Sequence, residues 1–105
     1  MRLSTNQQAA IIAVFGKHIA SNQASLYLYG SRTRDDLKGG DIDLLLITSP
    51  SHASLLRQEK YKILSEIDQA IGEQRIDLTI SSQAEASQDP FLKKILSEAI
   101  LLKNL

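Results

Sequence analysis

The sequence contains no cysteine and no tryptophan, and it has no long apolar run. Without cysteine there is no disulfide framework, no thiolate nucleophile and no cysteine-ligated zinc site. No apolar run approaches the roughly 20 residues that a membrane-spanning helix needs. The first ten residues, MRLSTNQQAA, also lack the apolar core of a secretory signal peptide. We therefore expect a cytoplasmic protein.

The sequence also lacks net charge, because twelve Lys and Arg residues balance twelve Asp and Glu residues. A neutral chain generates no global positive field toward nucleic acid or an anionic membrane, so any recognition of phosphate has to be local. With 105 residues, 43% hydrophobic and 23% charged, the composition is typical of a globular protein. We expect one domain over residues 1–105 with a single modest core.

Hydrophobic periodicity predicts alternating helices and strands along the chain. Helices are expected at residues 5–20, at about 55–71 with a carboxy-terminal cap at Gly72, and from Pro90, capped by Asp89, to about Leu102. Strands are expected at residues 25–29, 42–47 and 75–80, with a short loop or helix after the first strand and a polar loop at 81–88. This order predicts an α/β sandwich of about three strands.

Two aspartates, Asp41 and Asp43, stand at the start of an otherwise apolar strand, on the same side of it. Asp77 occupies the third expected strand, and if the two strands are neighbours all three carboxylates share one patch. Aspartate is depleted in strands and like charges repel, so a bound divalent cation accounts for a choice that packing does not. Hard oxygen ligands suit Mg²⁺. The alternatives are a polar strand entrance and, for Asp77, pairing with Arg75 or a loop amide.

The other end of the intervening loop has the features of an anion site. Gly30 and Ser31 directly follow a strand, where glycine lets backbone amides approach an anion and serine adds a hydroxyl donor. Arg32, Arg34 and Lys38 form a local basic cluster suited to phosphate oxygens. Carboxylates at one end and phosphate donors at the other indicate a nucleoside triphosphate site.

These residues resemble a known family. The segment GSRTRDDLKGGDID, Gly30 to Asp43, resembles the G-S…D-x-D signature of the DNA polymerase beta nucleotidyltransferase superfamily, and RIDLTI resembles the strand that carries its third aspartate. The chain is most similar to the minimal nucleotidyltransferases, which are commonly encoded beside a helical HEPN protein and often act as its antitoxin. The resemblance implies a polymerase beta-like fold with a small mixed β-sheet flanked by helices.

The resemblance also implies roles for individual residues. The resemblance implies that three residues bind two Mg²⁺ ions and are catalytic: Asp41, Asp43 and Asp77. It implies that Gly30 and Ser31 contact the nucleotide, with Arg32 and Arg34 as second-rank candidates for nucleotide binding. The sequence departs from many relatives at Asp35, where they have glycine, and at the following Asp36.

The function implied is a Mg²⁺-dependent transfer of AMP from ATP to a tyrosine hydroxyl of a HEPN toxin, with the chain acting as antitoxin. The alternative is a non-catalytic antitoxin that neutralises its partner by stoichiometric binding. The expected last helix carries eight apolar residues between Phe91 and Leu102, which are divided between core packing and a partner interface. Nucleic acid is not expected as a direct ligand, and antibiotic nucleotidylation is disfavoured because no drug-binding domain is visible.

Overall fold

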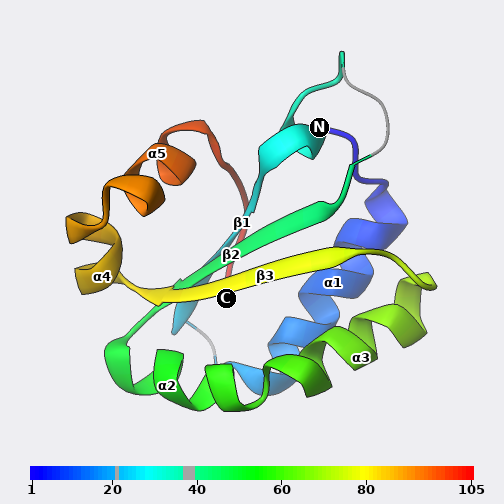
Figure 1. The fold of residues 1–105 in the computed structure, drawn as a ribbon. Coiled ribbons are helices and arrows are strands. Elements are labelled where there is room, and N and C mark those ends of the chain that lie inside the picture. The colour runs from blue at the N-terminus through cyan, green and yellow to red at the C-terminus, as the bar shows by residue number, and fades with distance from the viewer. Residues whose placement is uncertain (21, 37–39) are drawn as a thin grey trace.

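The computed structural model describes residues 1–20, 22–36 and 40–105 (Figure 1). Its elements in chain order are α1 (Thr5–His18), β1 (Ala24–Tyr29), the short 3₁₀ helix η1 (Gly30–Thr33), β2 (Ile42–Thr48), α2 (Pro50–Gln58), α3 (Lys60–Ile71), β3 (Ile76–Ser82), α4 (Gln83–Gln88), α5 (Pro90–Glu98) and β4 (Ile100–Asn104). Within these described ranges, no helix is both long enough and apolar enough to cross a membrane.

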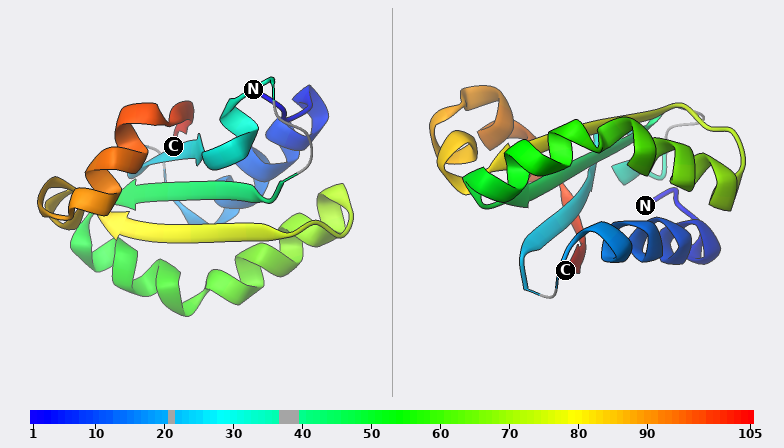
Figure 2. Two further views of the ribbon diagram at one scale, coloured as in Figure 1. Left: turned by 45° about the horizontal axis from the view of Figure 1, so that its top comes forward. Right: turned by 90° about the horizontal axis from the view of Figure 1, so that it is seen from below.

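The strands form one mixed sheet of four strands in the order β3-β2-β1-β4. β1 is antiparallel to β2 and to β4, whereas β2 and β3 run parallel and are connected through α2 and α3. Helices lie on both faces of this sheet (Figure 2). The predicted small mixed sheet flanked by helices is confirmed, with one strand more than expected.

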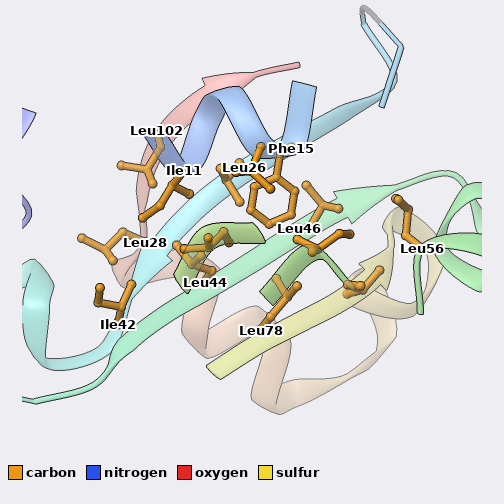
Figure 3. Packing of buried hydrophobic residues seen from close by; sticks show 14 of the residues in the cluster. Ile11, Phe15, Leu26, Leu28, Ile42, Leu44, Leu46, Leu56, Leu78 and Leu102 are labelled. Carbon is orange, nitrogen blue, oxygen red and sulfur yellow. The ribbon is translucent and has the colours of Figure 1, made fainter. Parts of the chain in front are cut away.

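One face of the sheet carries the larger part of the core. Ile42, Leu44 and Leu46 point from β2 into this face, and all three are fully buried. They pack in one cluster with Ile11 and Phe15 of α1 and with apolar residues of α2 and α3 (Figure 3). Because successive side chains of a strand point to opposite faces, Asp43, Leu45 and Ile47 face the other side of the sheet.

The opposite face carries a smaller core under the two short helices α4 and α5. Leu45 and Ile47 of β2 pack there against Ala86, Leu92 and Ile95. The two helices lie beside the end of the sheet where β2 and β3 finish (Figures 1 and 2). The residues at the start of β2 and β3 that share this face are the ones available to a ligand.

The expected last helix is too long. α5 ends at Glu98, Ala99 is extended, and Ile100–Asn104 form β4 on the free edge of β1. A short apolar run does not by itself distinguish a buried strand from a helix, which explains the error. Leu102 is 9% exposed and Leu101 is 47% exposed, as expected for adjacent residues of a strand. The eight apolar residues therefore do not form one helical surface for a partner.

Two other expectations are wrong in their boundaries. Residues 81–88 are not a loop, because β3 continues through Ser82 and α4 follows; the Ser82 hydroxyl caps this helix by accepting from the Glu85 amide at 3.1 Å. The expected single helix before Gly72 is two helices, separated by a turn at Glu59 and beginning as early as Pro50. Nδ1 of His18, the last residue of α1, lies 3.0 Å from Oε2 of Glu59, and this contact joins the turn to α1.

Candidate functional site

The site is built on one row of residues across three strands. The parallel register of β2 and β3 places Asp43 beside Asp77, and the antiparallel register of β1 and β2 places Tyr29 on the other side of Asp43. The structure therefore brings together two of the carboxylates that the sequence selected. It also adds Tyr29, whose hydroxyl lies 3.4 Å from Oγ1 of Thr79, the residue two positions after Asp77 in β3.

Asp41 lies two residues before Asp43, immediately ahead of β2. The amide of Ile42 donates to the Arg75 carbonyl at 2.9 Å, which extends the strand pairing to this end. Arg75 Nε lies 3.9 Å from Asp41 Oδ1, with the arginine side chain 89% exposed and the aspartate side chain 47% exposed. Arg75, weighed as a partner for Asp77, thus lies beside Asp41, and water screens this ion pair strongly.

The carboxylates at this end of the sheet influence one another. Burial raises the pKa of Asp43, and the negative charges of Asp77 and Asp41 raise it further. The pKa of Tyr29 is also raised, first by burial and then by the charges of Asp77 and Asp43. A patch in which adding negative charge is unfavourable is one that favours a cation.

Glycine makes room for the two candidate side chains at the ends of the loop. Gly30 has a φ of 77°, and a Cβ on it would overlap the carboxylate of Asp43. Gly40 has a φ of 90°, and a Cβ on it would overlap the hydroxyl of Ser31. The two ends of the loop therefore meet, with Ser31 against the residue that directly precedes Asp41. Reasoning from the sequence misses Gly40, for which its position beside Asp41 is the only signal.

Arg32 holds the loop together in this structure. Its Nε donates to the Gly40 carbonyl at 3.3 Å, and its Nη1 donates to the Arg2 carbonyl at 2.8 Å. These bonds fix the segment before α1 and the end of the loop against η1. Arg32 therefore shapes the phosphate end of the site through the backbone.

Arg34 forms an exposed two-pronged ion pair. Its Nε and Nη2 donate to the two carboxylate oxygens of Asp36 at 3.1 and 2.8 Å. The hydrogen bond and charge of Asp36 raise the pKa of Arg34. Asp35 pairs with the amino terminus of Met1, so both additional acidic residues of the loop have cationic partners. Lys38 lies outside the described residues.

Two cavities adjoin the turn at Gly30. One, of about 520 Å³, is lined by Gly30, Ser31, Thr33, Arg34 and Glu98. The other, of about 270 Å³, is lined by Tyr29, Gly30, Phe91, Lys94, Ile95 and Glu98. The first is the space where the loop sequence predicts phosphates. That α5 forms the walls of these cavities could not be predicted, because no local pattern indicates where a helix packs.

The three aspartates do not form a closed cage for an ion. Among residues 1–20, 22–36 and 40–105, no group of three or more acidic, histidine or cysteine side chains is arranged to hold a metal. Mg²⁺, however, typically takes only one or two protein carboxylates and completes its shell with water and substrate phosphate. The hard oxygens of Asp41, Asp43 and Asp77 fit this kind of site in their chemistry.

Comparison with protein families identifies the kind of domain that this chain forms. The family model described as "Polymerase beta, Nucleotidyltransferase" matches residues 9–104. A search of the curated proteins finds no match. Among solved structures, the chain is similar to a candidate nucleotidyltransferase from Sulfolobus solfataricus, at 16% identity and a TM-score of 0.43 over 90% of this chain and 81% of that one.

Proposed function

Because the chain belongs to the polymerase beta nucleotidyltransferase family, we propose that it transfers AMP from ATP to a protein hydroxyl. The observation that carries this proposal is the adjacency of two groups: the row of Asp43 and Asp77 on the sheet, and the turn at Gly30 with its neighbouring cavity. The first group suits the cation and the second suits the phosphates of one ligand.

Different residues of the chain bind the phosphates, accept the proton and hold the metal ions. The Gly30–Ser31 turn positions the terminal phosphates. The acceptor oxygen bonds to the α-phosphorus as the bond from that phosphorus to the bridging oxygen breaks, and pyrophosphate leaves. Asp77, exposed at the start of β3, takes the hydroxyl proton. Two Mg²⁺ ions, held by Asp41, Asp43 and Asp77 with phosphate oxygens, would neutralise charge and lower the pKa of the acceptor hydroxyl.

The acceptor that we propose is a tyrosine of a helical HEPN toxin, whose modification makes this chain an antitoxin. This part rests on the resemblance of the Gly30–Asp43 segment to the minimal nucleotidyltransferases. The site is consistent with it, because Asp77 lies at an open part of the sheet where another protein's side chain has access.

A second candidate function is stoichiometric inhibition without chemistry. One observation favours it: the described residues contain no closed set of metal ligands. In this case the chain would neutralise its partner by forming a complex, and the carboxylates would have no catalytic part.

The test combines the chain with the product of its neighbouring gene, Mg²⁺ and α-labelled ATP. The Asp41→Asn/Asp43→Asn double variant removes the site. Asp68→Asn is the matched control, because Asp68 is exposed on α3, which packs on the opposite face of the sheet.

Label on a partner tyrosine with the wild-type chain and the control, but not with the double variant, supports transfer. A complex that forms without label favours stoichiometric inhibition. If the chain neither labels nor binds the partner, both candidates are wrong.

A further inference from the structure

We propose that the cavity between the Tyr29–Gly30 turn and α5 binds the base of the nucleotide, with Phe91 as its stacking surface. This inference rests on the proposed function, since it names the second half of the same ligand site. It assigns a role to α5, which neither the signature nor the strand pattern indicated.

The cavity is placed where a nucleoside would follow its phosphates. It shares Gly30 and Glu98 with the larger cavity that contains Ser31 and Arg34, so the two form neighbouring compartments. Gly30 is also the residue against which the Asp43 carboxylate lies. Tyr29, which pairs with Asp43 in the sheet, also lines the smaller cavity, so this cavity adjoins the acidic row as well as the turn. A nucleoside attached to an α-phosphate at the acidic row can therefore reach it.

The lining of the smaller cavity matches a flat apolar ring with polar edges. Tyr29, Phe91 and Ile95 provide apolar surface, while Lys94 and Glu98 provide a donor and an acceptor. Ligand pockets typically combine such an apolar lining with a few polar groups that fix orientation. The acceptor at Glu98 favours a base with an exocyclic amino group, and adenine is the base that the proposed function requires.

Phe91 has no structural explanation in the core. It is 64% exposed, whereas Leu92 and Ile95 of the same helix are buried against β2. A single exposed aromatic is ordinary on a protein surface. This one lines a cavity that adjoins the candidate phosphate site, and an aromatic face there is suited to stacking a base.

The experiment measures dissociation constants for Mg-ATP and for Mg-tripolyphosphate, which has phosphates but no base. Phe91→Ala is expected to weaken ATP binding by about five- to 150-fold, the range that base stacking on an aromatic implies, and to leave tripolyphosphate binding unchanged. Phe91→Trp keeps an aromatic face and should retain ATP affinity. Lys94→Ala should also weaken ATP binding more than tripolyphosphate binding.

Two variants serve as matched controls. Tyr61→Ala removes an aromatic side chain that is 82% exposed on α3. Lys93→Ala removes a lysine that is next to Lys94 in the chain but lines a different cavity. Both should bind ATP as the wild type does. Thermal unfolding of each variant confirms that the fold is retained, which is expected because Phe91 is exposed.

The outcomes separate this inference from the proposed function. If Phe91→Ala binds ATP as the wild type does, or weakens ATP and tripolyphosphate equally, α5 does not bind the base and the proposed function is unaffected. If the wild-type chain binds neither ATP nor tripolyphosphate, the proposed function and this inference are both wrong.

Discussion

The carboxylate of Asp43 lies against the α-carbon of Gly30, in the space that a side chain would fill. Gly30 is the first residue of η1 and Asp43 is the second residue of β2, so this contact joins the phosphate end of the loop to its acidic end. The glycine also has a φ of 77°, in the region that residues with a side chain rarely adopt.

Gly30→Ala should therefore affect both stability and activity. The left-handed backbone alone costs an L-residue about 1–2 kcal/mol, and the added methyl group must displace the Asp43 carboxylate. We expect a lower free energy of unfolding by urea and loss of most of the transfer activity. Gly72→Ala is the matched control, because Gly72 has a φ of 86° but open space where its methyl group would lie. It should lose stability and keep its activity; equal losses of activity would show that Gly30 matters only for folding.

Asp43→Asn should produce the opposite combination, greater stability with less activity. The raised pKa of Asp43 means that the folded state disfavours its charge, so removing the charge should add roughly 0.2–1 kcal/mol at pH 7, the range for a cross-strand pair. The gain should vanish at a pH below the ordinary range for aspartate, where the wild-type group is also neutral. Activity should fall at least about a hundredfold if the carboxylate holds a catalytic cation. A variant that loses stability and activity together would indicate a structural role.

The acidic row could be predicted from the sequence because two simple rules determine it. Side chains alternate along a strand, and adjacent parallel strands align the residues near their starts, so Asp43 and Asp77 needed only a correct strand assignment to be placed together. The same alternation predicted β1 and β3 closely, and a continuous apolar run predicted β2. Helix starts were also predictable where a cap was explicit, as at Asp89, whose side chain accepts from the Phe91 amide at 2.9 Å.

The rest of the site depends on contacts between segments that are distant in sequence. Ile100–Leu102 form a strand because β1 has a free edge, which the apolar run itself does not reveal. Phe91 and Lys94 approach Gly30 only because α5 packs across the start of η1. Gly40 matters because of the Ser31 hydroxyl, nine positions earlier in the chain. No local sequence pattern indicates these contacts between distant segments.

Asp36→Asn should strengthen nucleotide binding. Asp36 accepts both hydrogen bonds of the Arg34 fork, and Arg34 lines the cavity next to Ser31. Without the competing carboxylate, the guanidinium is available to phosphate oxygens, and the dissociation constant for ATP should fall roughly two- to fivefold at low salt, with a smaller effect at high salt. Asp68→Asn makes the same change of charge on α3 and should have no effect. Unchanged affinity in Asp36→Asn would show that Arg34 does not contact the nucleotide.

Protonation of Glu85 should make the fold less stable in acid. Arg57 Nη2 lies 3.1 Å from both carboxylate oxygens of Glu85 and also donates to the Ile80 carbonyl at 2.8 Å, which ties α2 to β3 and α4. The hydrogen bond from Arg57 lowers the pKa of Glu85. A lowered pKa gives stability that is present above the unfolded value, about 4.3, and is lost as the pH falls through the folded one. Glu85→Gln should therefore be less stable than the wild type at pH 7, and the difference should shrink as the pH falls below the unfolded pKa of glutamate and disappear below the lowered pKa of folded Glu85. Urea unfolding across this range measures it, and a constant difference would mean that the charge is not responsible.

The two adjacent leucines of β4 test whether the carboxy-terminal segment is a strand. Leu102 belongs to the main core cluster and Leu101 is 47% exposed. Leu102→Ala should lower the free energy of unfolding by about 2–3 kcal/mol, toward the lower end of the range for core leucines because the residue lies on an edge strand. Leu101→Ala should change it by less than about 0.5 kcal/mol, as for other surface positions. Urea denaturation of the two variants gives the comparison directly. Similar losses at both positions would mean that Leu101 is also buried, as it would be if this segment formed an interface with another protein; a large loss at Leu102 alone is the outcome that β4 predicts.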